Sequence, residues 1–459
     1  MANPPTASVA GLKPRIVRVV PRNRNIEALL LIFAVGINAF EIAQIQLAAL
    51  QQLTSEFMIY WAPVSFAALV LHLTMRRRAS NADPLILPIA MLLNGLGISM
   101  IYRLDLATVA NHGAQLFAGK QVIWTLLAMI IAGAVLVYVP NHLFLRRYVF
   151  IAMFVGIGLL LTPMLPFIGR NINGAQLWIG IGAFTFQPGE LAKIALTIFF
   201  AGYLVNRRES LAAVGRKVLG VQLPRARELG PILTIWVASL AVLVFQHDLG
   251  TSLLYFGLFL VMIYVATGRA IYVGVGLGMF VTGALIAAKI MSYVSGRVDA
   301  WLNPFDQANY DAVGGSYQLV QGIFGMAHGG VLGSGLGGGV PNLVPLAESD
   351  FIFASLGEEI GMIGLFAVLA LYLLWVSRGL RIGYKHSDDF SRLLATGLSF
   401  VIALQVFIVI GGVTRVVPLT GLTTPLLAAG GSSLVSNWII IALLLRISDS
   451  MRTKAKVAE

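Results

Sequence analysis

The chain has 459 residues, of which 58% are hydrophobic and only 11% are charged. A soluble domain carries about 25% charged residues, and a helix that crosses a bilayer needs about 20 mostly apolar residues. The composition therefore excludes a soluble enzyme, a DNA-binding protein and a secreted domain, and it predicts an all-α polytopic membrane protein. The chain contains no cysteine, which excludes disulfides, thiolate metal sites and cysteine nucleophiles.

Apolar runs bounded by charged or turn residues predict about twelve transmembrane helices. A basic tail, residues 1–25, precedes the first span, which we read as a retained helix because no small-residue cleavage site follows it. A second tail, residues 448–459, follows the last span. The predicted spans are 26–45, 57–75, 84–102, 120–139, 147–165, 188–205, 230–246, 250–267, 270–291, 351–377, 391–412 and 431–447.

The distribution of positive charge predicts the orientation of these spans. If the N-terminus lies inside, the inner segments hold 25 Lys and Arg residues, the outer segments hold 6, and Lys193 lies within a span. Lys and Arg in short loops mark the cytoplasmic side. Both termini are therefore predicted to be cytoplasmic, and the net charge of +12 needs no nucleic-acid partner to explain it.

Two external loops, 166–187 and 292–350, are long. The second is acidic and has Arg297 as its one basic residue. Long loops on a rigid scaffold commonly carry function, so we expect chemistry there. The acidic residues of this loop are Asp299, Asp306, Asp311, Glu348 and Asp350.

Ionisable residues inside or beside spans are costly and by default mark a functional cavity. Those of this chain all lie in the outer half of the membrane. If they are functional, Glu190 and Lys193, spaced i and i+3, are expected to pair and to face a water-accessible cavity that opens outward. The alternative is that Glu190–Lys193 is a structural ion pair and that Glu359 is a solvated helix residue. The set comprises Glu41, Glu190, Lys193, Asp248, Glu358 and Glu359.

Three further features have two readings each. Asp350 directly precedes the tenth span, where it fits either a helix N-cap or a catalytic carboxylate. Trp178 lies at headgroup depth, where tryptophan is also a common interfacial anchor. The segment Gly329–Gly339 contains 7 glycines but lacks the ending of a phosphate-binding P-loop, and it predicts a mobile or closely packed re-entrant loop.

Seven ordered segments resemble the SEDS (RodA/FtsW) family of shape, elongation, division and sporulation proteins. They cover roughly residues 84–447. The segments are NGAQLWIGIGAFTFQPGELAK (173–193), QHDLGTSLL (246–254), WLNPFD (301–306), GGSYQLVQ (314–321), GVLGSGLGGG (330–339), ESDFIFASLGEEIGMIG (348–364) and PLTGLTTPLLAAGGSSL (418–434).

The resemblance implies a ten-helix core over 84–447, preceded by two extra N-terminal helices over 26–83, with a large external loop before helix ten. Members of the family are peptidoglycan glycosyltransferases that polymerise lipid II at the outer face of the cytoplasmic membrane and release undecaprenyl pyrophosphate. The resemblance favours a role in cell elongation over a role in cell division. The resemblance also implies a class B penicillin-binding protein as partner, a divalent cation, Mg or Mn, held by the acidic loop, and no organic cofactor.

The resemblance also assigns roles to residues. Asp350 matches the essential loop aspartate of the family and is expected to be the general base, and Trp178 matches an important loop tryptophan. Lys193 and Arg297 are expected to offset the charge of the leaving pyrophosphate. Glu190, Asp248 and Glu358 complete the expected substrate-binding set. One departure is His247, which stands where the family usually has proline.

Two rival functions remain open. A flippase would carry the same lipid-linked precursor across the membrane with many of the same residues. A non-enzymatic scaffold would hold an elongation or division complex. The one-sided depth of the ionisable residues argues against a flippase, which would need polar residues through the inner half as well. The acidic external loop is more than a scaffold needs.

Overall fold

The computed structural model describes residues 22–110, 116–172, 174–181, 184–212, 217–218, 221–222 and 246–458. Within those ranges, 11 helices are long and apolar enough to cross a membrane. They match eleven of the twelve predicted spans, and the remaining one, 230–246, lies almost entirely outside the described residues. The expected multi-pass helical fold is confirmed.

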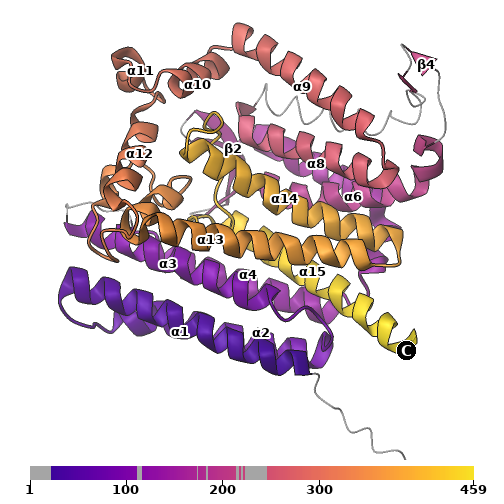
Figure 1. Cartoon of the computed structure of the whole chain (residues 1–459), viewed down its shortest axis with the longest axis horizontal. Coiled ribbons are helices and arrows are strands. Elements are labelled where there is room, and N and C mark those ends of the chain that lie inside the picture. The colour runs from indigo at the N-terminus through magenta and orange to yellow at the C-terminus, as the bar shows by residue number, and fades with distance from the viewer. Residues whose placement is uncertain are drawn as a thin grey trace, which may run out of the picture.

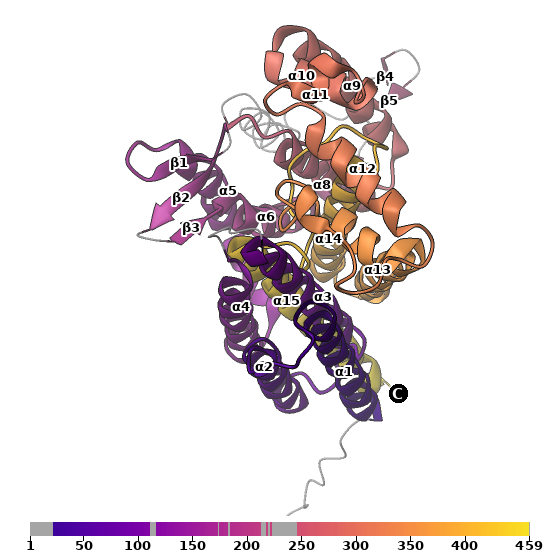
Figure 2. The same cartoon turned by 90° about the vertical axis from the view of Figure 1, so that its left-hand side faces the viewer.

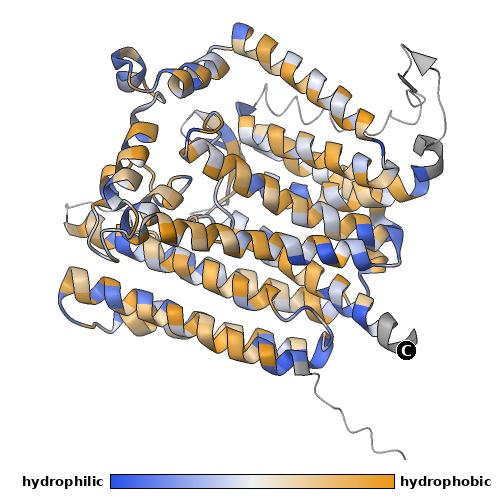
Figure 3. Cartoon of the chain, in the orientation of Figure 1, coloured by the Kyte–Doolittle hydropathy of each residue, from blue (hydrophilic) through white to orange (hydrophobic). Residues whose placement is uncertain are grey.

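The spanning helices run side by side, and their connections gather at two opposite ends of the bundle (Figure 1). Apolar residues cover the middle of the helices, and hydrophilic residues concentrate toward these two ends (Figure 3). The helices are α1 (Arg22–Leu50), α2 (Glu56–Arg78), α3 (Ile86–Ala110), α4 (Ala118–Tyr138), α5 (Val149–Leu161) with the flanking 3-10 turns η1 (His142–Tyr148) and η2 (Thr162–Met164), α6 (Pro188–Ala212), α8 (Leu249–Thr267), α9 (Ala270–Ile290), α13 (Ile352–Lys385), α14 (Asp389–Val413) and α15 (Gly431–Ala458).

Several helices extend beyond the predicted spans. Helix α3 continues to Ala110, so Arg103 belongs to the helix and not to the loop after it. Helix α13 reaches Lys385 and is interrupted at Gly361, whose φ of 66° and ψ of −175° are not helical. Only glycine adopts that backbone conformation without strain, so the kink follows from the sequence at this position.

Both long loops that are predicted to be external contain regular structure that no local sequence pattern indicates. The first forms an antiparallel sheet of β1 (Gly169–Ile172), β2 (Ala175–Ile181) and β3 (Phe184–Phe186), in that order. The second contains α10 (Ser292–Leu302), α11 (Gln307–Asp311), α12 (Tyr317–Gly329) and the turn η3 (Pro341–Leu343). Both lie at one end of the bundle, which faces the viewer in Figure 2. A small hairpin at the other end pairs β4 (Lys217–Val218) with β5 (Val221–Gln222).

The centre of the bundle is formed by α3 and α15, each with 89% of its most apolar window buried. Polar side chains between them are paired. The indole Nε1 of Trp438 donates to Asn94 Oδ1 at 2.9 Å, and Asn94 Nδ2 donates to Thr125 Oγ1 at 3.2 Å. Pairing of this kind is needed because a bilayer supplies no water to buried polar groups.

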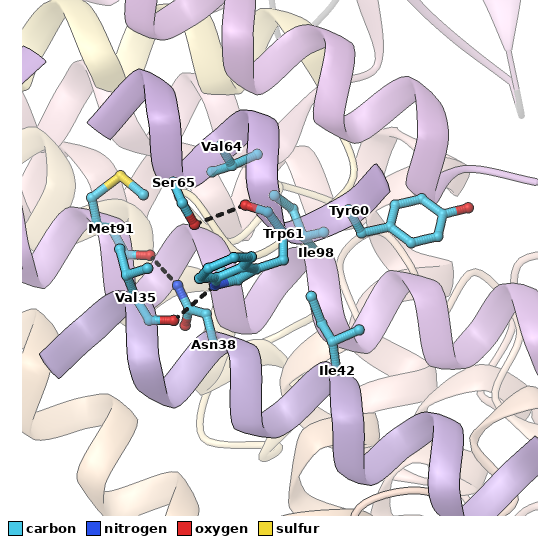
Figure 4. Close-up of a pocket in the computed structure, with 10 residues that line it drawn as sticks. Val35, Asn38, Ile42, Tyr60, Trp61, Val64, Ser65, Met91 and Ile98 are labelled. Carbon is cyan, nitrogen blue, oxygen red and sulfur yellow. Dashed lines mark hydrogen bonds between the residues drawn. The ribbon is translucent and has the colours of Figure 1, made fainter. Parts of the chain in front are cut away.

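Of the first two helices, α1 packs against the core through α3, and α2 packs against α4 and α1 (Figure 4). Trp61 Nε1 of α2 donates to the backbone oxygen of Val35 in α1 at 3.0 Å. Asn38 Nδ2 of α1 donates to the backbone oxygen of Met91 in α3 at 3.1 Å. These contacts attach the middle of α1 to α2 and α3.

Candidate active site at the loop-bearing end

Asp350 lies in the turn that leads into α13, at the end of the bundle that carries the long loops. The N-cap position of α13 is Phe351, and no side chain there makes a capping hydrogen bond. The helix-cap reading of Asp350 is therefore wrong. Asp350 is 8% exposed, so its carboxylate is enclosed without serving the helix terminus.

Burial changes the acidity of this carboxylate. Loss of water raises the pKa of Asp350 to about 6, although a hydrogen bond to its own backbone N–H, the charge of Arg297 and a hydrogen bond to Gln318 each lower the pKa. A carboxylate with a pKa near neutrality is suited to accept a proton, because it is still mostly ionised at pH 7. The neighbouring Glu348 is affected in the same direction, as burial also raises its pKa.

Arg297, from α10, is the cation of this site. Its Nη1 donates to the backbone oxygen of Leu419, in the loop between α14 and α15, at 2.7 Å. Its guanidinium lies 4.9 Å from the ring centroid of Tyr293. Its charge lowers the pKa of both Asp350 and Asp248. Three predicted site residues are thus linked electrostatically.

Asp248 caps α8. Its Oδ1 accepts from the backbone N–H of Thr251 at 3.0 Å, whereas its buried Oδ2 has no hydrogen-bond partner among the described residues. Burial raises its pKa, and the charge of Arg297 is one of the effects that lower it. The preceding residue, His247, adopts a φ of 56° and its ring contacts that of Tyr293 edge-on. An unpaired carboxylate oxygen beside a cation is available to a polar ligand.

The structure does not bring Trp178 close to Asp350, Arg297 and Asp248. Trp178 lies in β2, where it is opposite Arg170 of β1, and its side chain is partly buried. Strand β2 packs against η2 and α6, and the sheet projects away from α10 and α12 (Figure 2). Its role in substrate binding stays a prediction.

Glu190 and Lys193 form the expected ion pair, at 2.5 Å between Oε2 and Nζ. Lys193 also donates to Gln405 Oε1 at 3.0 Å, and Ser436 Oγ donates to Glu190 Oε2 at 3.0 Å. The two residues are 6% and 2% exposed, so the expected water-accessible cavity around them is not found in the described part of the chain. This enclosure favours the structural ion pair.

Glu358 and Glu359 hold the glycine-rich segment. Glu358 Oε1 accepts from the backbone N–H of Val340 at 2.8 Å, so this carboxylate is engaged by the protein itself. Glu359 is 1% exposed and pairs with Arg103 at 2.8 Å, which contradicts the reading of Glu359 as a solvated residue. Sequence reasoning assigned Arg103 no role. A charged residue within the apolar run of α3 was the signal that could have identified it.

The acidic loop, 292–350, does not gather metal ligands among its described residues. Within the described residues, no group of three or more His, Asp or Glu side chains is placed to hold a metal ion. These donors do not fit the expected cation. Mg or Mn therefore stays a prediction that depends on the resemblance alone.

The fold and the site define a multi-pass membrane protein with two buried carboxylates, Asp350 and Asp248, and the partly buried guanidinium of Arg297 at the end that carries its large loops. The family model of the cell cycle proteins FtsW, RodA and SpoVE matches residues 83–453. The chain therefore belongs to the FtsW/RodA/SpoVE family, as the seven segments predict. The match begins after α2 and leaves out the first two helices.

Curated relatives extend the match. The chain is 44% identical to the peptidoglycan glycosyltransferase RodA of Mycobacterium tuberculosis, over 94% of this chain and 92% of that protein. It is 43% identical to the protein of the same name from Mycobacterium leprae, with the same coverage. A probable peptidoglycan glycosyltransferase FtsW from a Geobacter species is 32% identical over 83% of this chain. Because the mycobacterial matches omit so little of the chain, they extend into the first two helices.

Solved structures share the fold. A structure described as the structural coordination of polymerization and crosslinking by a peptidoglycan synthase complex matches with a TM-score of 0.55 and 22% identity, over 85% of this chain and 98% of that one. A variant of the rod shape determining protein RodA of Thermus thermophilus matches with a TM-score of 0.55 and 21% identity, over 80% of this chain and 97% of that one.

Proposed function

We propose that this protein is a peptidoglycan glycosyltransferase that polymerises lipid II for cell elongation. The observation that carries the proposal is the buried Asp350 beside Arg297, in a chain 44% identical to curated RodA glycosyltransferases over 94% of its length. The site lies at the outer face of the cytoplasmic membrane, and both termini are cytoplasmic. The support for this orientation is the excess of Lys and Arg in the segments at the opposite end.

The chemistry that the site supports is a direct displacement. Asp350 accepts the proton of the 4-hydroxyl of the acceptor sugar as that oxygen attacks the anomeric carbon of the donor. The new glycosidic bond forms as the bond from the anomeric carbon to the pyrophosphate oxygen breaks, and the electron pair leaves with undecaprenyl pyrophosphate. Attack from the opposite side inverts the anomeric centre.

The two other members of the group assist this step. The guanidinium of Arg297 offsets negative charge as it develops on the leaving pyrophosphate, because a fixed cation in a site of low water content stabilises such charge strongly. The unpaired Oδ2 of Asp248 accepts a hydrogen bond from a sugar hydroxyl or amide. Burial of both carboxylates keeps water away from the reacting atoms.

The partner is a class B penicillin-binding protein, which crosslinks the strands that this protein makes. The support is the solved complex of similar fold, whose description joins polymerization and crosslinking. Division is the second candidate role, since a probable FtsW is also similar over 83% of the chain.

The test uses purified full-length protein in liposomes with lipid II, with and without a class B penicillin-binding protein. The expected result is glycan strands that are absent with Asp350→Asn. A flippase would instead move lipid II across the bilayer at the same rate in the wild type and the variant, without glycan strands. A scaffold would do neither. Addition of a chelator tests the expected divalent cation in the same assay.

A further inference from the structure

The glycine-rich segment, Gly329–Gly339, replaces helix hydrogen bonds that α13 loses at its kink. Only glycine fits at the closest approach, since a Cβ on Gly333 would lie 2.2 Å from the backbone oxygen of Glu359. The segment is therefore closely packed against α13, as one of the two expected readings has it. The bonds run from the N–H groups of Ser334 and Gly335 to the oxygens of Glu358 and Glu359, both at 3.0 Å, and from the N–H groups of Met362 and Ile363 to the oxygens of Gly330 and Val331, at 3.0 and 3.2 Å.

A buried ion pair fastens the end of this segment. Glu359 Oε1 accepts from Arg103 Nε at 2.8 Å, and its Oε2 accepts from the N–H of Gly337 at 3.0 Å. Arg103 Nη2 donates to the backbone oxygen of Gly339 at 2.7 Å. Because Arg103 belongs to α3 and Glu359 to α13, one pair of side chains holds two helices and the segment together.

Helix α1 also packs against the glycine-rich segment. A Cβ on Gly337 would lie 2.6 Å from Ala48 Cβ and 3.6 Å from the backbone oxygen of Ile45. Helix α1 and the glycine-rich segment are thus in close contact at this point, although Ala48 is otherwise exposed. Helix α1 cannot retreat easily, because Asn38 holds it to α3.

The glycine-rich segment lies close in the chain to Asp350, the candidate base. Val340, whose N–H is bound by Glu358, lies ten residues before Asp350. Helix α13 begins two residues after Asp350. The backbone oxygen of Glu348 accepts from the N–H of Ala429 at 2.7 Å, which fixes the loop just before Asp350. The segment is therefore connected to Asp350 through the ten residues that precede it and through the first turns of α13.

We propose that the N-terminal helix α1, which lies outside the family model's match, is a positioning element for the reaction site. Ala48 contacts Gly337 and holds it in place. This contact maintains the hydrogen bonds of Arg103 and Glu359 to the glycine-rich segment. The position of the segment in turn determines the position of Asp350. Ala48 and Arg103 are positioning residues, since neither touches the group formed by Asp350, Arg297 and Asp248. The step from position to rate rests on the proposed function.

The test places a large side chain at the contact between Ala48 and Gly337. Ala48→Trp should push Gly337 away from Glu359. The matched control is Leu47→Trp in the same turn, because Leu47 is exposed like Ala48 but is not among the atoms nearest to a Cβ on Gly337. Hydrogen–deuterium exchange of the amides in 334–340 is measured in the full-length protein. Ala48→Trp and Arg103→Met should both speed exchange there, and Leu47→Trp should not. This readout needs no lipid II and therefore stands whether or not the protein polymerises it.

Polymerisation kinetics then test the consequence. Misplacing a reacting group by about 1 Å can cost roughly a hundredfold in rate, so Ala48→Trp should lower kcat by about tenfold to a hundredfold with KM nearly unchanged. Since both variants act through one contact chain, adding Ala48→Trp to Arg103→Met should cost little more. Exchange and kcat in Ala48→Trp equal to those in Leu47→Trp would overturn the proposal. Faster exchange with unchanged kcat would also overturn it, because α1 would then brace the segment without affecting the reaction.

Discussion

Two buried carboxylates at opposite ends of the bundle, those of Asp83 and Asp350, differ in the partners that surround them. Asp83, at the end that carries the C-terminus, accepts from Arg378 Nε at 3.0 Å and from Arg452 Nη2 at 2.8 Å. Asp350, at the other end, is also buried, but the cation that lowers its pKa, Arg297, is bound to a backbone oxygen as well. The carboxylate of Asp83 is occupied by hydrogen bonds from two arginines and links α13 to α15. The carboxylate of Asp350 is still able to take a proton.

The same contrast separates the ionisable residues that the sequence predicts to lie in the outer half of the membrane. Glu190, Glu358 and Glu359 are all occupied by protein partners. Asp248 keeps a free buried oxygen beside Arg297. Occupied carboxylates stabilise the fold, and incompletely paired ones are candidates for chemistry.

The largest effect is expected from Asp350→Asn. An amide cannot accept the proton, so the polymerisation rate should fall by a factor of roughly 10²–10⁴. The folded protein should be at least as stable as the wild type at pH 7 to 8. The reason is that burial raises the pKa of Asp350, so the ionised form that prevails at that pH opposes folding and the amide removes this cost. Glycan assays and thermal melts of Asp350→Asn and Asp350→Ala check both points.

Arg297→Gln should have the next largest effect. Loss of a fixed charge that stabilises a transition state typically costs about 10²–10³ in kcat. Arg297 also lowers the pKa of Asp350, so its removal should raise that pKa and move the acid limb of the pH–rate profile to higher pH. An Arg297→Gln profile that coincides with the wild-type profile would show that the two side chains do not interact.

Lys193→Met should act on stability more than on chemistry. It leaves Glu190 buried beside Ser436 without its cation, and breaking a buried pair in this way costs about 3–5 kcal/mol. The melting temperature should fall clearly, while the activity per folded molecule changes several-fold at most. A near-complete loss of polymerisation with an unchanged melt would instead give Lys193 the pyrophosphate-binding role that the resemblance implies.

Asp83→Asn should have the smallest effect on activity. Hydrogen bonds to charged groups contribute about 1.5–3 kcal/mol each, so the melt should shift downward through the weakened contacts with Arg378 and Arg452. Polymerisation per folded molecule should stay at the wild-type level. A large loss of kcat without a change in the melt would break the distinction between the two ends of the molecule.

Much of the architecture could be predicted from the sequence, because crossing a bilayer requires long apolar runs and orients them by flanking charge. The segments that could not be predicted depend on contacts distant in the chain. Arg103 and Glu359 are separated by 256 positions, and neither has a local pattern that names its partner. The sheet of β1, β2 and β3 is another example, since Trp178 looks like an interfacial anchor until its pairing with Arg170 is known.

The candidate site likewise has features that local sequence predicts and features that depend on distant contacts. The position of Asp350 before an apolar run favoured the cap over the base, and only the geometry of α13 removed the cap. The spacing of Glu190 and Lys193 correctly predicted their ion pair, but burial depends on α14 and α15 packing around it. Local spacing predicts which side chains can meet, and the packing of distant helices decides whether water reaches them.

The most direct measurement of the central claim is the pH–rate profile of lipid II polymerisation by the wild-type protein between pH 5 and 8. Asp350 must be ionised to accept a proton, and its pKa of about 6 means that about nine-tenths of the molecules are ready at pH 7. We predict that kcat is level above pH 7 and falls about tenfold for each unit of pH below about 6, with the protein folded throughout. A kcat that stays constant down to pH 5 would contradict the assignment of Asp350 as the base.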